Sequence, residues 1–167
     1  PEDLFYKCSS LKSVTGFSNL KSIGEKAFYG CSNLEKVDGL DKLTSIPWSL
    51  FYECSNLTTI DIDFSKIISI DDGAFDGCHK LNFSEDGVLN LPNIESIGSY
   101  VFYYCYGLKK VITGEKLVTL DVGVFYGCSG LLSINVNGLD TDNVWDMSQM
   151  FYGCSSLSSL DVSKFNT

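Results

Sequence analysis

The sequence contains few of the residues from which catalytic and metal sites are usually built. It has a single histidine, His79, and none of its seven cysteines forms a Cys-x-x-Cys pair, so the ligand spacing of a zinc site is missing. Calcium loops of the EF-hand type, Gly-x-Ser-x-Gly elbows and phosphate-binding P-loops do not occur in the sequence either. We therefore predict that the chain is not an enzyme and holds no cofactor or metal.

Positive charge and long apolar segments are also scarce. The chain has 12 Lys and Arg residues against 21 Asp and Glu residues, which gives a net charge of −9. Such an acidic chain repels the phosphates of nucleic acids and of anionic membrane surfaces. No apolar run approaches the roughly 20 residues that a membrane helix needs. The composition predicts neither a nucleic-acid partner nor membrane insertion of this segment.

What the sequence does contain is one structural unit repeated seven times. Each cysteine lies three residues after a Phe and three residues before a Leu, and successive cysteines are 23 to 27 residues apart. The seven Phe residues of this motif are Phe5, Phe28, Phe51, Phe75, Phe102, Phe125 and Phe151. A second aliphatic pair, such as Leu43 and Ile46, recurs later in the unit. Self-similarity at this period is the signature of a solenoid.

The apolar spacing predicts how each unit folds. Phe and Cys at positions i and i+3 would share one face of a short helical turn. Apolar and polar residues alternate in Ile60–Phe64 and in Leu160–Ser163, as in a half-buried strand. Stacked units would bury their Phe, Cys and Leu side chains in one continuous core, with strands about 4.8 Å apart in a parallel sheet. The stretch Asn82–Asn93 carries extra residues, including Ser84–Gly87, and predicts a bulging loop.

Two segments resemble a known family. The unit from Ala27 to Val37 is similar to the BspA-like leucine-rich repeats of bacterial surface proteins, and Asn143 to Thr167 resembles a related repeat of about 26 residues. The resemblance implies an α/β solenoid of the leucine-rich-repeat type, a right-handed, horseshoe-like coil with a parallel β-sheet on its concave side and short helical turns opposite. It also implies a secreted or cell-surface protein that binds host proteins or cells, with no shared catalytic residues.

We interpret residues 1–167 as a single leucine-rich-repeat domain of about seven repeats, taken from a longer protein and without its capping units. Uncapped end repeats expose apolar faces, so end-to-end self-association is expected.

The seven cysteines allow two interpretations. Like positions in adjacent coils would lie close enough for a disulfide. However, stacked side chains point in parallel and an odd number leaves one cysteine over, which favours free, buried thiols that pack as small apolar groups.

Two surfaces are candidates for binding a protein or glycan ligand. The first is a row of polar strand positions expected on the concave face, the usual docking surface of solenoids. It comprises Lys36, Asp38, Thr59, Asp61, Asp63, Lys110, Ser133, Asn135, Ser159 and Asp161. The alternative for this row is a solvated sheet face without a ligand.

The second candidate surface is an aromatic stripe made by the residue after each Phe. That residue is Tyr in six of the seven units, with Asp76 as the exception. The stripe comprises Tyr6, Tyr29, Tyr52, Tyr103, Tyr126 and Tyr152. These rings are expected at an outer edge, stacked coil upon coil, either as a structural ladder or as a recognition surface. The function predicted is adhesion through the repeat surface. The alternative is a structural spacer in a surface stalk that has no ligand of its own.

Overall fold

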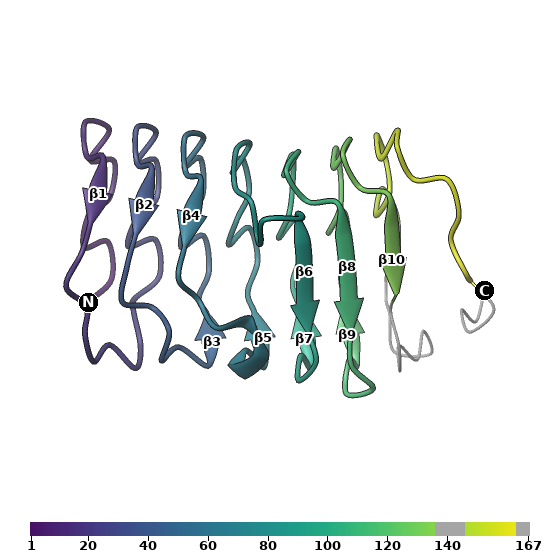
Figure 1. Cartoon of the computed structure of the whole chain (residues 1–167), viewed down its shortest axis with the longest axis horizontal. Helices are drawn as coiled ribbons and strands as arrows, with labels where there is room; N and C mark the ends of the chain where they lie inside the picture. The colour runs from purple at the N-terminus through teal and green to yellow at the C-terminus, as the bar shows by residue number, and fades with distance from the viewer. Residues whose placement is uncertain (136–145, 163–167) are drawn as a thin grey trace.

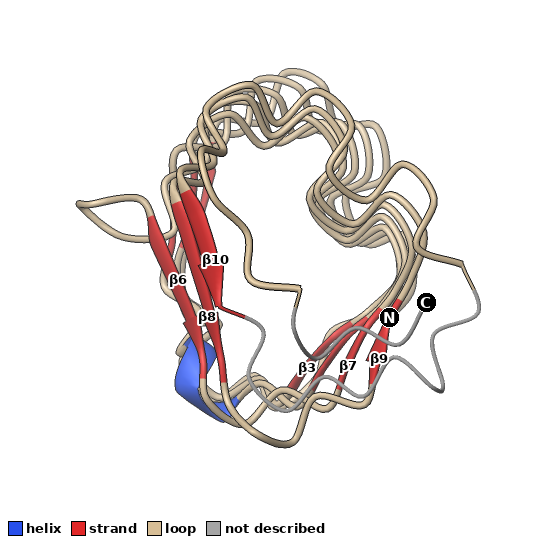
Figure 2. Cartoon of the chain, turned by 90° about the vertical axis from the view of Figure 1, so that its right-hand side faces the viewer, coloured by secondary structure: helices blue, strands red, loops and turns tan. Residues whose placement is uncertain are grey.

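The chain forms an elongated stack of coils. The computed structural model describes residues 1–135 and 146–162, and the coils succeed one another along the long axis from the N-terminal to the C-terminal end (Figure 1). The view along that axis shows strands on two sides of the coil and irregular turns on the remaining side (Figure 2). The molecule is therefore a parallel β-solenoid.

The strands are short and pair in register between equivalent positions of successive coils. On one side, β1 (Ser13–Val14), β2 (Lys36–Val37) and β4 (Thr59–Ile60) form one sheet, and β6 (Val88–Leu91), β8 (Lys110–Thr113) and β10 (Ser133–Asn135) form another. On the other side, β3 (Ser45–Ile46), β5 (Ser69–Ile70), β7 (Ser96–Ile97) and β9 (Thr119–Leu120) form the third. All pairs are parallel.

A single row of Phe rings forms the centre of the core. Successive rings lie 5.2–5.9 Å apart between centroids, with interplanar angles of 2–12°. The five inner rings are fully buried, whereas Phe5 and Phe151 at the ends are half-buried. The separations fit offset stacking of parallel rings. The predicted continuous core is thus confirmed, and it holds the outer residues of each coil in repeating columns.

The predicted helical turns around each Phe are wrong. Among the described residues, the only helical element is the 3-10 turn η1 (Phe64–Lys66). The residues two before and two after each Phe adopt positive φ angles, such as 51° at Ser49 and 57° at Glu53 around Phe51. Left-handed residues interrupt a right-handed helix. The Phe28 N–H donates instead to the Leu50 carbonyl of the next coil, at 3.0 Å.

The cysteine thiols provide hydrogen-bond donors for the backbone carbonyl groups of the turns beside the core. Except in the first unit, each thiol donates a hydrogen bond to the Phe carbonyl of the preceding coil, at 3.0–3.2 Å. Burial raises the pKa of Cys31 to about 11, so its thiol stays protonated. The predicted free, buried thiols are confirmed at six positions. Cys8 is exposed, contrary to that prediction.

Two departures from the regular coil lie where the repeat is irregular. The loop that precedes β6 projects from the stack, as the extra residues Ser84–Gly87 predicted (Figure 2). Phe83 packs edge-on against Phe75 and Phe102, with centroids 5.6 and 5.5 Å away. Phe83 is partly buried and packs against the core beside the projecting loop, while Leu89 of β6 takes the buried strand position in register with Val111.

Two predicted strands are shorter than expected or missing. Only Ile60 of Ile60–Phe64 lies in a strand, because the Asp63 carboxylate caps η1 by accepting the Ser65 N–H at 3.2 Å. Residues Leu160–Val162 form no strand, which corrects that prediction, while Ser163 lies outside the described residues.

Candidate interaction surface

Part of the predicted row of polar strand residues is already bonded within the chain. Lys36 and Asp38 form an ion pair at 2.9 Å. The Asp61 carboxylate accepts the backbone N–H groups of Gly39 and Leu40 at 2.5 and 2.8 Å. These three side chains would have to exchange existing partners in order to bind a ligand.

Asp63 is held in a similar way. It forms an ion pair with Lys66 at 2.7 Å, and the hydrogen bonds from Lys66 and Ser65 lower the pKa of its carboxyl to about 2. Its carboxylate therefore stabilises the η1 turn.

The rest of that row does not form one continuous face. Thr59, Lys110 and Asn135 are exposed on their strands, and Ser133 is half-buried. Ser159 and Asp161 are exposed but lie outside any strand. The irregular coil with Ser84–Gly87 lies between the part of the row on β4 and the part on β8, and these two strands belong to separate sheets. A ligand role for the row stays a prediction.

The aromatic stripe does stack coil upon coil, but in two blocks. Successive rings of Tyr6, Tyr29 and Tyr52 lie 5.0 and 4.6 Å apart. The rings of Tyr103, Tyr126 and Tyr152 lie 4.8 and 4.6 Å apart. Asp76 occupies the position between the two blocks, so the stripe is broken at its middle.

Two further tyrosines extend the second block sideways, and glycines make room for them. The rings of Tyr100 and Tyr104 lie against Gly123 and Gly127 of the next coil, where an added Cβ would be only 2.3 and 2.1 Å from ring atoms. Tyr103 and Tyr104 pack edge-on at 4.4 Å. The block thus presents a broad aromatic surface.

An exposed tryptophan that was not among the predicted site residues lies beside the stripe. Trp48 is 42% exposed, and the Lys26 ammonium lies 4.1 Å from the centre of its ring, which is a cation–π contact. Two adjoining hollows share Trp48 and Asp72. The sequence does mark Trp48 as a departure from the repeat, because the other units have smaller or polar residues at the equivalent position.

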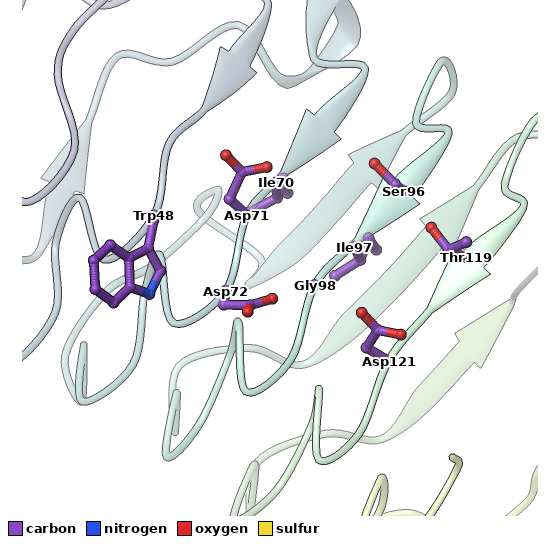
Figure 3. Close-up of a pocket in the computed structure, with 9 residues that line it drawn as sticks. All are labelled: Trp48, Ile70, Asp71, Asp72, Ser96, Ile97, Gly98, Thr119 and Asp121. Atoms are coloured by element: carbon purple, nitrogen blue, oxygen red, sulfur yellow. The ribbon is translucent and has the colours of Figure 1, made fainter. Parts of the chain in front are cut away.

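The first hollow lies where β5, β7 and β9 end, and it is acidic (Figure 3). Asp71, Asp72 and Asp121 line it together with Trp48. The Asp72 carboxylate accepts the Ser99 N–H at 2.8 Å. Burial first, and then the neighbouring Asp72 charge, raise the pKa of both Asp71 and Asp121. This surface favours cations over anions.

The second hollow, about 560 Å³ in volume, runs along the aromatic side. Tyr29, Tyr52 and Tyr100 contribute to its walls, and Asp76 lines it. Burial, and next the charge of Glu53, raise the pKa of Asp76 to about 7. Asp76 is therefore a half-buried carboxylate that the fold does not stabilise in its charged form.

That raised pKa predicts how Asp76 affects stability. The pKa of the Asp76 carboxyl is about 7 in the folded state and near 3.8 in the unfolded chain, so the folded state binds the proton more tightly. Asp76 therefore favours folding below about pH 4, and this contribution to stability is lost as the pH rises through 7. The full shift corresponds to about 4 kcal/mol, and solvent screening reduces the expected effect to about 1–2 kcal/mol. Asp76→Asn should therefore raise the free energy of unfolding by about 1–2 kcal/mol at pH 8 and change it little at pH 4.

Urea denaturation at the two pH values measures this effect. Asp63→Asn is the control of opposite sign, because the lowered pKa of Asp63 stabilises the fold above pH 4. Equal stability changes for Asp76→Asn at both pH values would contradict the assignment.

Other kinds of site find no support in the described part of the chain. Within residues 1–135 and 146–162, no three His, Cys, Asp or Glu side chains are grouped so as to hold a metal ion. No helix in these two ranges has the length and apolar character needed to cross a membrane.

The fold and the repeat define the class of protein as a leucine-rich-repeat solenoid. The model of the BspA type leucine rich repeat region matches residues 1–85 and 85–167 in six copies, so the chain belongs to that family. Families of this type are typically non-enzymatic repeat proteins. No curated protein matches the sequence significantly.

Three solved structures are similar to this chain, and the first of them, with a TM-score above 0.5, shares its fold. A leucine-rich repeat protein of T. pallidum is similar at a TM-score of 0.58 and 22% identity, over 84% of this chain and 72% of that chain. A leucine-rich cell surface protein from Faecalibacterium prausnitzii A2-165 aligns at a TM-score of 0.42 and 20% identity, over 96% of this chain and 63% of that chain. A leucine-rich repeat protein from Bacteroides ovatus ATCC 8483 aligns at a TM-score of 0.43 and 20% identity, over 96% of this chain and 69% of that chain.

Proposed function

We propose that this chain is a secreted or cell-surface adhesion module, and that it binds a protein ligand through the aromatic side of the stack. The observation that carries the proposal is the hollow beside Trp48, where an exposed indole and several Tyr rings surround polar groups. Tyr and Trp are enriched in binding surfaces because they bury a large area at a small cost in side-chain entropy.

The state of the polar strand residues supports this choice of face. Lys36, Asp38, Asp61 and Asp63 already bond within the chain. A ligand at that row would have to replace these interactions, whereas one on the aromatic side would cover exposed rings and gain from their burial. The surface location rests on membership of the BspA-type family.

Binding to immobilised host matrix proteins and to a glycan array tests the proposal. We expect the purified chain to bind at least one matrix protein, and Trp48→Ala to weaken this binding about tenfold, which is the loss of a modest hot spot. Leu132→Ala is the matched control, since Leu132 is another exposed apolar side chain, at 54% against 42% for Trp48. Circular dichroism checks that both variants fold.

The competing function is a spacer that projects another domain and has no ligand. A chain that retains nothing above an albumin background on every surface would favour the spacer and contradict the adhesion proposal. Equal losses for Trp48→Ala and Leu132→Ala would place the ligand on another face.

A further inference from the structure

The break in the aromatic stripe is a pocket with a definite structural origin. In the coil of Phe75, the three outward columns of the turn carry Gly73, Asp76 and Gly77. The preceding coil has Tyr52 in the middle column, and the following coil has large side chains in all three columns, Tyr100, Tyr103 and Tyr104. One coil with small side chains between two bulkier ones leaves a gap on the surface.

Aromatic rings form the walls of this gap. Tyr52 lies on one side, and Tyr100 and Tyr103 on the other, around a hollow of about 370 Å³ that Asp76 also lines. The gap opens beside the larger hollow, because Tyr52, Asp76 and Tyr100 line both. The faces of aromatic rings carry negative charge density and attract cations.

The carboxylate in the gap has no side-chain partner among residues 1–135 and 146–162. No side-chain hydrogen bond or ion pair of Asp76 is found among the described residues, and every buried polar side-chain atom there has its partner. The Asp76 oxygens are therefore open to a ligand. The ammonium of Lys26, which lines the adjoining hollow, lies over Trp48. Glu53 adds a second negative charge beside Asp76.

We propose that the gap between Tyr52 and Tyr103 is a binding pocket for a basic side chain, Lys or Arg, of a partner protein. The cation lies between the Tyr rings and forms a charge-assisted hydrogen bond with the Asp76 carboxylate. The net charge of −9 draws a basic partner toward this surface. This inference rests on the proposed function as an interaction module, and it names the chemistry of the ligand.

The probe for the pocket is the blocked peptide acetyl-Gly-Arg-Gly-amide, compared with the same peptide that carries citrulline in place of Arg. Citrulline has nearly the same shape but no charge. Heteronuclear NMR titration of the chain at pH 8 and low salt gives both affinities. We expect the Arg peptide to bind about fivefold to thirtyfold more tightly than the citrulline peptide, with shifts at Tyr52 and Tyr103.

Three variants locate the effect. Asp76→Asn should weaken binding of the Arg peptide about fivefold or more, and Asp76→Tyr should abolish it by completing the stripe. Asp86→Asn removes one exposed carboxylate from the projecting loop, and it should change the affinity less than twofold. The affinity should also fall as the pH drops through about 7 and Asp76 takes up a proton. The other titratable groups that interact with Asp76 are Glu53 and the neutral Tyr and Cys side chains around it.

The results separate this proposal from the function on which it rests. Equal affinities for the Arg and citrulline peptides, or equal effects of Asp76→Asn and Asp86→Asn, would overturn the pocket. So would a neutral oligosaccharide, cellotetraose, that binds the gap independently of Asp76. If matrix-protein binding persists unchanged in Asp76→Asn, the pocket assignment fails and the adhesion function stands. If the Arg peptide binds but no matrix protein does, the pocket assignment stands and the adhesion function fails.

Discussion

Phe125→Ala should lower the free energy of unfolding by about 3–5 kcal/mol, as truncation of large buried aromatic residues does. Phe125 is fully buried, and its ring lies 5.7 Å from that of Phe102 and 5.8 Å from that of Phe151. Alanine would leave a cavity in the row of rings, which the neighbouring coils cannot close without giving up their own contacts. Urea denaturation followed by circular dichroism measures the change.

Phe151→Ala is the matched control for this prediction. Phe151 is the last ring of the row and is half-buried, so its truncation should cost clearly less than that of Phe125. A loss below about 1 kcal/mol for Phe125→Ala would show that the ring is not part of a tightly packed interior.

Gly127→Ala should lower the free energy of unfolding by about 2–5 kcal/mol. Gly127 has a φ of 71°, which costs an alanine about 1–2 kcal/mol. A Cβ there would also lie 2.1 Å from Cδ1 of Tyr104 in the preceding coil, and overpacking of this kind adds about 1–3 kcal/mol. Thermal and urea denaturation both report the loss.

Two further variants divide that cost into its parts. Gly73→Ala has a similar φ of 60°, but its Cβ would meet nothing closer than 3.4 Å, so it should show the backbone cost alone. In Tyr104→Ala, the added Gly127→Ala change should likewise cost only about 1–2 kcal/mol. Equal costs for Gly127→Ala and Gly73→Ala in the parent chain would mean that Tyr104 does not pack on Gly127.

The core of this fold could be predicted from the sequence because its periodicity is nearly complete. Each Phe, Cys and Leu recurs at the same place in the unit, and like residues can all be buried together only if the coils stack in register. The aromatic stripe followed from the same argument, since Tyr29 and its equivalents occupy one column. Stacking in register determines which side chains meet, whatever the local backbone conformation.

The local conformation itself could not be predicted in this way. Spacing of i and i+3 suits a helical turn and a series of tight turns equally well. The distinguishing feature is the left-handed residue on each side of the Phe, and non-glycine residues such as Lys26, Ser49 and Tyr104 hold that conformation in several coils. Such residues give little sequence signal for positive φ. The ladder of hydrogen bonds between coils stabilises them in it.

The candidate site differs from the core because it arises where the repeat is broken. Asp76 was visible as the one exception in the Tyr column, but its meaning depended on the rings of Tyr52, Tyr100 and Tyr103 that the neighbouring coils place around it. Trp48 could have been found by the same comparison of columns. In a solenoid, the repeated positions maintain the scaffold, and the positions that depart from the repeat give the surface its specific features.

The most direct test of the stacked interior is an aromatic NOESY spectrum of the chain with labelled Phe rings. Contacts at 5.2–5.9 Å between centroids predict cross-peaks between Phe28 and Phe51, Phe51 and Phe75, and so on along the row, with none that skips a coil. Cross-peaks between rings from non-successive coils, or rings that show contacts only to water, would contradict the stacked core and the surface built on it.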